Sequence, residues 1–384
     1  MGDQLLIEQI QALEQELSTT KYNKRTEHAI GLLKVKIARL KEQLESRRTI
    51  RKQAQRPSYA VKRNGDATVA LIGFPSVGKS TLINKLTNAN SKIASYNFTT
   101  LNCIPGLMEY KNAKIQILDL PGILEGAADG TGKGKETISV LRNADLILLL
   151  ADAYAVEAQL PVLRKEIYSA RIRLNQKKPD VKIDKKARGG VTISSTVKLT
   201  KIKKDEIVSA LKEFRIMNAD VIVRDNINIS QFIDSITGNR KYASGLFVIN
   251  KIDIVGQQEI SRVKKYMAEL SKKSVVLKDK SGVNYVMISA EKGINLELLK
   301  EAIYQKLKFI RIYLREVGKE ADLDKPMIMR EGAAIRDVCS KIHTSFVEKL
   351  RFARVWGKSA KFPGQKFKLE HVLKDGDIVQ LHLK

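Results

Sequence analysis

The segment from residue 73 to residue 80 constrains the fold of this chain more than any other feature. It reads Gly-Phe-Pro-Ser-Val-Gly-Lys-Ser, which fits the pattern G-x-x-x-x-G-K-[ST], and it directly follows the apolar run Thr68–Ile72. Glycines let consecutive backbone N–H groups converge on phosphate oxygens, while Lys79 can reach the β- and γ-phosphates and the Ser80 hydroxyl can bind Mg²⁺. The motif therefore predicts a strand, a phosphate-binding loop and a helix beginning near Lys79.

Three downstream motifs follow in the order that a guanine-nucleotide switch requires. Asp119-Leu120-Pro121-Gly122 ends an apolar run and can place a carboxylate near Mg²⁺ and a glycine N–H near the γ-phosphate. Asn250-Lys251-Ile252-Asp253 ends another, and Asp253 can accept both donors of guanine's Watson–Crick edge. Ser289-Ala290 suits a loop whose backbone meets the base carbonyl. Since ligands of open α/β sheets bind at the carboxyl ends of strands, the set predicts one nucleotide site rather than an accidental glycine-rich turn.

Composition points to an intracellular protein with a polyanionic partner. The 384 residues are enough for two to three domains, and the net charge is +27. The segment 164–204 carries 14 lysines and arginines against 3 acidic residues, a net +11. Such an excess favours RNA as a partner, and a general lysine-rich composition is the alternative. No apolar run spans a membrane, no signal peptide is evident, and two cysteines and four histidines form no disulfide or metal framework, so we expect a cytoplasmic protein with no membrane contact. We also expect a monomer.

The hydrophobic pattern predicts an α/β fold built of several modules. Leu6, Ile10, Leu13 and Leu17 recur at helical spacing, and a second helix through residues 30–44 continues the pattern, which indicates a helical hairpin. This hairpin either packs on its own domain or forms a docking arm for a partner. From residue 67, strands and helices alternate, as in a doubly wound parallel sheet with helices on both faces. About seventy residues between 173 and 246 exceed any plain loop and predict an inserted α/β subdomain, and the last 76 residues indicate a small β-grasp module.

The motifs resemble those of the Obg-like GTPases, and in particular the branch called developmentally regulated GTP-binding proteins (DRG). The phosphate loop, the stretch Tyr96–Leu101 and the stretch Asp119–Ala127 are similar to the phosphate loop and two switches of that family, while Thr26-Glu27-His28 and Ala353–Gly357 resemble the DRG branch. The resemblance implies a P-loop NTPase sheet of the Obg-type G domain. It implies these domains: an N-terminal helical hairpin and basic linker at 1–66, a G domain at 67–308 with an inserted subdomain at about 174–244, and a TGS (ubiquitin-like β-grasp) domain at 309–384.

The motifs and the resemblance together predict the site residues. The expected nucleotide-binding residues are Gly73, Phe74, Pro75, Ser76, Val77, Gly78, Lys79, Ser80, Thr81, Phe98, Thr99, Thr100, Asp119, Gly122, Asn250, Lys251, Asp253, Ser289 and Ala290. We expect Lys79, Thr100 and Gly122 to act in catalysis and Ser80, Thr100 and Asp119 to hold Mg²⁺. The choice of Thr100 over Thr99 follows from alignment with the family.

The resemblance implies that GTP is hydrolysed to GDP and phosphate and that the nucleotide state controls association with ribosomes in translation. Ile123 stands where small GTPases often carry a glutamine that orients water, so we expect slow intrinsic turnover, with Glu125 a candidate group. Ser76 stands where potassium-using relatives carry an asparagine, which leaves a K⁺ requirement open. We expect the ribosome, rRNA or tRNA to bind basic surfaces and a protein partner to bind the N-terminal helices or the TGS domain. A constitutive RNA- or ribosome-binding scaffold with a structural nucleotide is the alternative, and Asp253 argues against an ATPase.

Overall fold

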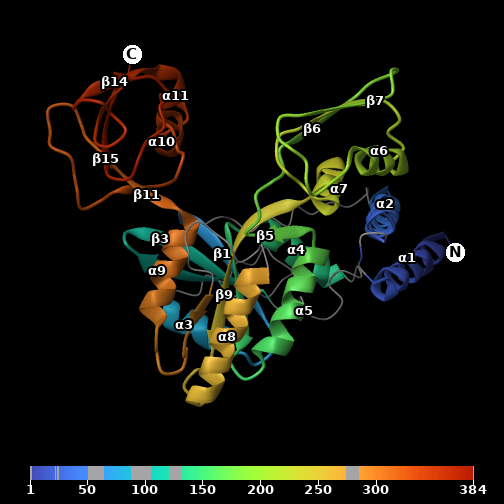
Figure 1. The fold of residues 1–384 in the computed structure, drawn as a ribbon. Helices are drawn as coiled ribbons and strands as arrows, with labels where there is room; N and C mark the ends of the chain where they lie inside the picture. Colours follow the sequence, from blue (N-terminus) through green and yellow to red (C-terminus); the bar gives the residue numbers. More distant parts are fainter. Residues whose placement is uncertain are drawn as a thin grey trace. The chain divides into compact units, whose positions relative to one another are not determined.

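The computed structural model of the chain divides into two compact units (Figure 1). It describes residues 2–21, 23, 26–50, 65–87, 105–120, 132–273 and 285–383. One unit combines Met1–Ser58 with Lys177–Tyr242, and the other combines Tyr59–Gln176 with Ala243–Lys384. The inserted segment and the N-terminal helices therefore belong to one compact body, and the nucleotide motifs and the C-terminal module belong to the other.

The second unit is built on a mostly parallel sheet. In the described part of the chain its path of strands runs β10-β9-β4-β1-β3-β2, and β5 pairs with β9 outside that path. All neighbours on the path are parallel except β2 and β3, which form an antiparallel hairpin. The strands are β1 (Ala67–Gly73), β2 (Pro105–Tyr110), β3 (Ala113–Asp119), β4 (Leu146–Asp152), β5 (Ile172–Leu174), β9 (Lys241–Asn250) and β10 (Tyr285–Met287). This topology confirms the predicted doubly wound α/β fold.

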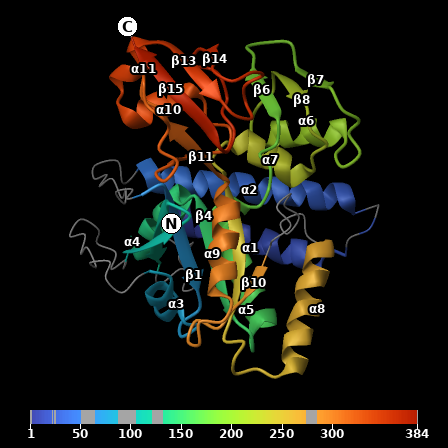
Figure 2. The same ribbon diagram turned by 90° about the vertical axis from the view of Figure 1, so that its left-hand side faces the viewer.

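Helices cover both faces of this sheet, because its central strands bury apolar side chains on both sides. Along β1, Val69 and Leu71 belong to one core, with α3 and α9, while Ala70 and Ile72 belong to the other, with α4, α5 and α8. Figure 2 shows α3, α5, α8 and α9 around the strands. The helices are α3 (Lys79–Leu86), α4 (Gly132–Asn143), α5 (Val156–Ser169), α8 (Gln257–Lys273) and α9 (Leu296–Leu307).

A second sheet follows α9 in the same unit and forms the predicted β-grasp domain. Its order is β12-β11-β15-β13-β14, with β11 and β15 parallel and the other pairs antiparallel. Phe309 and Ile328 share the core of α9, and Arg330 pairs with Asp145 at 2.7 Å, so the domain is anchored on the nucleotide domain. The elements are β11 (Phe309–Leu314), β12 (Met327–Arg330), α10 (Ile335–Ile342), α11 (Ser345–Lys349), β13 (Leu350–Trp356), β14 (Gln365–Phe367) and β15 (Asp377–Leu383).

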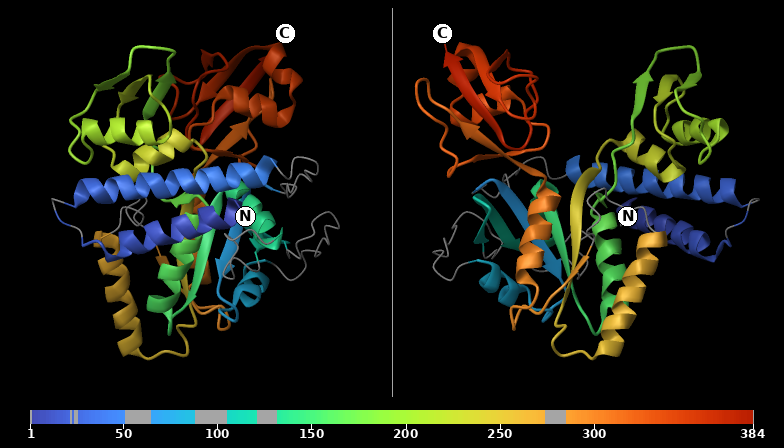
Figure 3. Two further views of the ribbon diagram at one scale, coloured as in Figure 1. Left: turned by 90° about the vertical axis from the view of Figure 1, so that its right-hand side faces the viewer. Right: turned by 60° about the vertical axis from the view of Figure 1, so that its left-hand side comes forward.

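The first unit joins two N-terminal helices to a small α/β module (Figure 3). Its sheet has the order β6-β8-β7, in which β6 is antiparallel and β7 parallel to β8. The helix α2 contacts both α6 and α7, and Val35 of α2 is 1% exposed in the core that contains Ile207 and Phe232. The elements are α1 (Gly2–Thr19), α2 (Glu27–Ile50), β6 (Val181–Lys185), β7 (Val191–Ser195), α6 (Lys204–Glu213), β8 (Ala219–Val223) and α7 (Ile229–Thr237).

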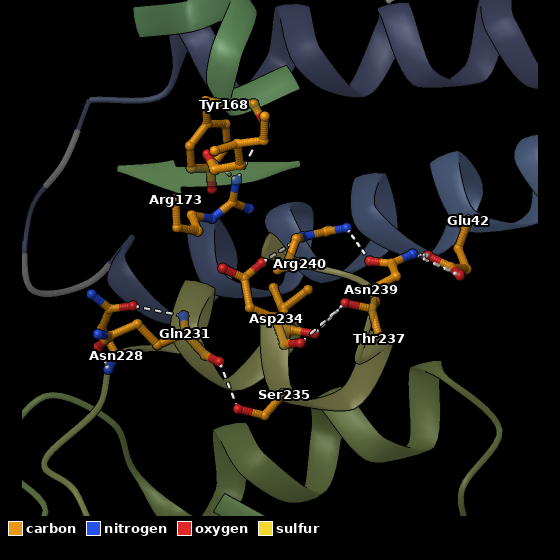
Figure 4. A network of polar contacts seen from close by, with 12 residues as sticks. Glu42, Tyr168, Arg173, Asn228, Gln231, Asp234, Ser235, Thr237, Asn239 and Arg240 are labelled. Carbon is orange, nitrogen blue, oxygen red and sulfur yellow. Dashed lines mark hydrogen bonds and ion pairs between the residues drawn. The ribbon is translucent and has the colours of Figure 1, made fainter. Parts of the chain in front are cut away.

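Polar side chains reinforce this packing of α2 on the inserted module. The Asn239 amide of the module donates to the Glu42 carboxylate of α2 at 3.0 Å, and Arg240, which donates to Asn239, holds this residue in place by also donating to Asp234 at 2.8 Å (Figure 4). Asp234 and Arg240 form a nearly buried ion pair, with side chains 5% and 11% exposed. The second helix of the hairpin is therefore held by the module rather than projecting from it as an arm.

Candidate nucleotide site

The phosphate loop has the conformation that its glycines permit. Ser76 and Gly78 both have positive φ, at 59° and 93°. Helix α3 begins immediately afterwards at Lys79, and its N-cap residue, Gly78, offers no side chain to bind the N–H groups of the first turn. A Cβ on Gly78 would lie 2.4 Å from the Asn250 side-chain nitrogen, so only glycine fits. Val77 points inward and is 1% exposed, whereas Ser80 is exposed on the first turn of α3. The loop thus presents the helix N-terminus outward, where an anion can bind backbone N–H groups.

Lys79 and Asp119 form the charged centre of the site. The Lys79 ammonium donates to the backbone carbonyls of Gly73 at 3.1 Å and Phe74 at 2.9 Å. Burial lowers the pKa of Lys79, and the negative charge of Asp119 opposes this shift. Burial likewise raises the pKa of Asp119, and the positive charge of Lys79 opposes it. Both groups are poorly solvated here, so further ligands for their charges would stabilise them.

Asp119 also carries an unsatisfied acceptor. Its Oδ1 atom is the one buried side-chain polar atom in the described residues that has no hydrogen-bond partner. The parallel register pairs Asp119 with Leu71, two residues before the phosphate loop begins. Buried acceptors without partners are costly, so this oxygen fits a role as acceptor for a metal-bound water. Mg²⁺ prefers oxygen ligands, and among the described residues Ser80 and Asp119 supply them, so these side chains are chemically suitable for a Mg²⁺ site.

Asn250 connects the base-recognition motif to the phosphate loop. It lies at the end of β9, is 2% exposed, and donates from Nδ2 to the Val77 carbonyl at 2.8 Å. Its Oδ1 accepts from the Ala290 N–H at 2.9 Å. One side chain therefore fixes three predicted motifs relative to one another, and sequence spacing alone gave no sign of this brace.

Asp253 and Lys251 occupy the loop that follows Asn250. Lys251 has φ 67°, and its ammonium pairs with Asp152 at 2.7 Å. A hydrogen bond from the Ser289 hydroxyl lowers the pKa of Asp253, helped by the charge of Lys292 at 3.9 Å. Asp253 is thus held ionised as a pure acceptor, which suits the two N–H donors of guanine. Asp152 was not among the predicted residues, although its position at the end of β4 was a readable signal.

The structure brings most of the predicted residues to the carboxyl edge of the sheet. These are Gly73, Phe74, Pro75, Ser76, Val77, Gly78, Lys79, Ser80, Thr81, Asp119, Asn250, Lys251, Asp253, Ser289 and Ala290. Phe98, Thr99, Thr100 and Gly122 lie outside the described residues, as do Ile123 and Glu125. No cluster of three or more His, Cys, Asp or Glu that could hold a metal occurs in the described parts of the chain. Nor does any described helix have the length and hydropathy needed to cross a membrane.

Comparison with known proteins finds matching families and relatives. Residues 68–185 match the family described as 50S ribosome-binding GTPase, residues 188–309 match the C-terminal region of the same domain (MMR_HSR1), and residues 310–383 match the TGS domain. The chain is 51% identical to an uncharacterized GTP-binding protein of Methanocaldococcus jannaschii, over 100% of this chain and 95% of that protein. It is 41% identical to developmentally-regulated GTP-binding protein 2 of Homo sapiens, over 98% of this chain and 99% of that protein.

Solved structures of GTPases are also similar, at lower identity. The YchF GTPase of Schizosaccharomyces pombe aligns with a TM-score of 0.42 at 15% identity, covering 84% of this chain and 99% of that one. Era in complex with MgGDPNP and a 16S ribosomal RNA segment aligns with a TM-score of 0.35 at 22% identity, covering 76% of this chain and 72% of that one.

Proposed function

The chain belongs to the developmentally regulated GTP-binding protein family, and on that premise we propose that it hydrolyses GTP and uses its nucleotide state to control ribosome binding. The observation that carries the proposal is the pair formed by Lys79 and Asp119 beside the phosphate loop. A desolvated ammonium and a buried carboxylate oxygen without a partner are arranged for a triphosphate and a hydrated cation. A loop that only shaped a turn would need neither.

The residues of the site have separable tasks in this proposal. Lys79 and the loop N–H groups stabilise the charge that develops on the γ-phosphate. Ser80, Asp119 and Thr100 would hold Mg²⁺, which would supply positive charge to neutralise the phosphates. Asp253 selects guanine, since an adenine edge would leave its carboxylate facing an acceptor. Thr100 and Gly122, which lie outside the described residues, are the groups that would sense the loss of the γ-phosphate.

Ile123 supports slow intrinsic turnover. An isoleucine cannot donate or accept a hydrogen bond, so it cannot orient the attacking water as a glutamine does. Water orientation then comes from a partner, a monovalent cation or another switch residue such as Glu125. This same residue favours the second candidate function, a ribosome-binding scaffold that keeps its nucleotide bound without turning it over.

The basic surface of the inserted module supports ribosome binding through RNA. Its exposed cations lie along β6, in the β6–β7 connection and from the end of β7 to the start of α6: Lys182, Lys185, Lys186, Arg188, Lys198, Lys201, Lys203 and Lys204. Lys182 pairs with Asp184 and Lys186 pairs with Asp220, so those charges are partly neutralised. The remaining cations can replace condensed counterions on RNA phosphates, and binding should then weaken steeply as salt rises.

Two measurements test the proposal. Multiple-turnover phosphate release separates a GTPase from a scaffold, because a scaffold with a structural nucleotide releases no more than one phosphate per protein. Sedimentation with ribosomes of Methanocaldococcus jannaschii, in GTP, GDP or a non-hydrolysable analogue, tests the switch. Equal sedimentation in all three states, with no turnover, contradicts the proposal and leaves the scaffold.

The surface can be tested by charge removal. Neutralising Lys185, Lys198 and Lys201 to glutamine should weaken sedimentation, whereas the matched triple change of Lys165, Lys264 and Lys265 on helices α5 and α8 should not. Equal binding of both triple variants would show that charge on the inserted module is incidental.

A further inference from the structure

The sheet of the TGS domain has a buried face and an open face. Ala353, Val355 and Val379 are fully buried in one core with Val338 of α10. Because side chains alternate along a strand, their neighbours Phe352, Arg354 and Trp356 point to the other side of the sheet. Figure 2 shows α10 and α11 together on one side of these strands. The opposite side is therefore free of the domain's own helices.

Aromatic and cationic side chains alternate on this surface. We define the open face by six residues, Arg315, Phe352, Arg354, Trp356, Lys366 and His382. The β13–β15 register places Phe352 opposite His382, and the β13–β14 register places Arg354 opposite Lys366. Cations and π-surfaces therefore follow one another across three strands.

The aromatic side chains are already arranged for stacking. The rings of Phe352 and His382 stack with centroids 4.5 Å apart and an interplanar angle of 22°. The Lys366 ammonium lies 4.9 Å from the Phe352 centroid, and the Arg315 guanidinium carbon lies 4.9 Å from the Trp356 ring. Phe352 and His382 are half-buried, while Arg354 and Lys366 are exposed. A flat π-surface bordered by solvated cations is the arrangement that binds bases and phosphates together.

The charge around this stack has one sign. Burial lowers the pKa of His382, and three cations, Arg354, Lys366 and Arg351, lower it further. No carboxylate contributes to that shift. None of the six residues of the open face is acidic. The potential at the stack is therefore positive and complementary to a polyanion.

We propose that the open face of the TGS domain binds single-stranded RNA, with an unpaired base extending the Phe352–His382 stack and phosphates contacting Arg354 and Lys366. Double-stranded RNA offers phosphates but no free base face, so it cannot use the stack. An acidic protein segment can use the charges but gains nothing from aromatic planarity. This inference rests on the proposed function only for the source of the RNA, the ribosome, because the surface itself lies apart from the nucleotide site.

Trp356 gives a direct readout, because it is the only tryptophan in the chain and lies on the open face. Titrating the full chain with a single-stranded oligouridine at low salt should change tryptophan emission, and a duplex of equal length should bind at least about tenfold more weakly at this site. A polyglutamate peptide of matched charge should produce a smaller change than either. Stronger binding by the duplex or the peptide would overturn the proposal.

Matched variants separate stacking from charge and from folding. Phe352→Leu keeps apolar volume but removes the ring, and should weaken oligouridine binding about tenfold, since one base stack is worth that order of affinity. Phe352→Tyr restores a ring and should restore binding. Arg354→Gln with Lys366→Gln should weaken binding and flatten its salt dependence, whereas Arg336→Gln with Lys349→Gln, on α10 and α11, should do neither. Unchanged emission titrations for Phe352→Leu and for the Arg354/Lys366 variant would refute the inference.

The same variants keep this inference distinct from the proposed function. None of them lies at the nucleotide site, so phosphate release should be unchanged in all of them. Loss of oligouridine binding with normal GTP turnover supports the open face. Normal oligouridine binding in these variants, together with ribosome binding that depends on GTP, contradicts the open face and leaves the proposed function intact.

Discussion

The side-chain amide of Asn250 donates to the backbone carbonyl of Val77 at 2.8 Å, across 173 positions of sequence. The contact joins the loop that reads the base to the loop that binds the phosphates. Its other end accepts the Ala290 N–H, so the third motif is fixed by the same side chain. Occupancy of the base pocket and order in the phosphate loop are therefore physically coupled.

Replacing Asn250 by alanine should weaken both nucleotide binding and folding. The change leaves a buried carbonyl and a buried N–H without partners, and each such group costs roughly 1–3 kcal/mol. We expect a lower unfolding midpoint in denaturant and at least about a tenfold loss of GDP affinity in calorimetry. Asn226→Ala, which removes a turn contact to Thr200 in the other unit, should leave GDP affinity unchanged. If Asn250→Ala bound GDP with wild-type affinity, the Asn250 side chain would not be needed to hold the two loops together for nucleotide binding.

Gly78 and Gly189 form a matched pair that separates backbone strain from contact. Their φ values are 93° and 104°, so an alanine at either position is strained by about 1–2 kcal/mol. Only Gly78 also has a neighbour in the way, since an added Cβ would lie 2.4 Å from the Asn250 side-chain nitrogen, whereas Gly189 faces open space. Gly78→Ala should abolish detectable GDP binding, and Gly189→Ala should lower stability slightly and bind GDP normally. Equal GDP affinities, measured by calorimetry, would show that the contact is unimportant.

Local sequence patterns predicted the nucleotide domain well because its strands are buried on both faces. The apolar run Thr68–Ile72, for example, lies inside β1. The motifs themselves end the strands, so their edge of the sheet was predictable too. What the pattern could not supply was the brace through Asn250, which is a contact between distant segments.

The inserted module and the β-grasp domain were harder to predict in detail. Strand β6 alternates apolar and charged residues over only five positions, which is too short a run to stand out from its lysine-rich surroundings. Helix α7 begins at a signal that is present in the sequence, because Asn228 and Gln231 form a reciprocal capping box at 3.0 Å. Strand β14 has three residues, too few for any periodicity. The burial of Val35 against the inserted module is tertiary, and the predicted domain boundaries stay a proposal.

Asp253→Asn should exchange guanine for xanthine. The carboxylate accepts from two guanine donors, whereas an asparagine presents one acceptor and one donor and so suits xanthine, which has a carbonyl in place of the exocyclic amine. We expect GDP affinity to fall by about 100-fold or more and XDP affinity to rise, because a buried mismatch leaves polar groups unpaired. Competition between the two nucleotides measures both. Lys292→Gln, which removes the neighbouring charge but not the acceptor, should keep the guanine preference; unchanged GDP affinity in Asp253→Asn would contradict base recognition.

Asp119 should make the nucleotide-free protein less stable as pH rises. Burial raises the pKa of its carboxyl above the ordinary 3.8, so the folded state holds the proton more tightly than the unfolded state. The stability contributed by protonation is fully present below that ordinary value and is lost as pH rises through the raised pKa. Asp119→Asn is neutral throughout, so it should unfold at a higher temperature than the wild type above this window and approach it below.

In the same experiment, Mg²⁺ with GDP should raise the unfolding temperature of the wild type by mass action but raise that of Asp119→Asn much less. Glu291→Gln, a change at an exposed carboxylate, serves as the control. It should keep the wild-type dependence of unfolding temperature on pH and the full wild-type response to Mg²⁺ with GDP. The prediction is contradicted if the unfolding temperatures of the wild type and Asp119→Asn depend on pH in the same way and rise equally with Mg²⁺ and GDP. The carboxylate would then neither be destabilised by burial nor bind the metal.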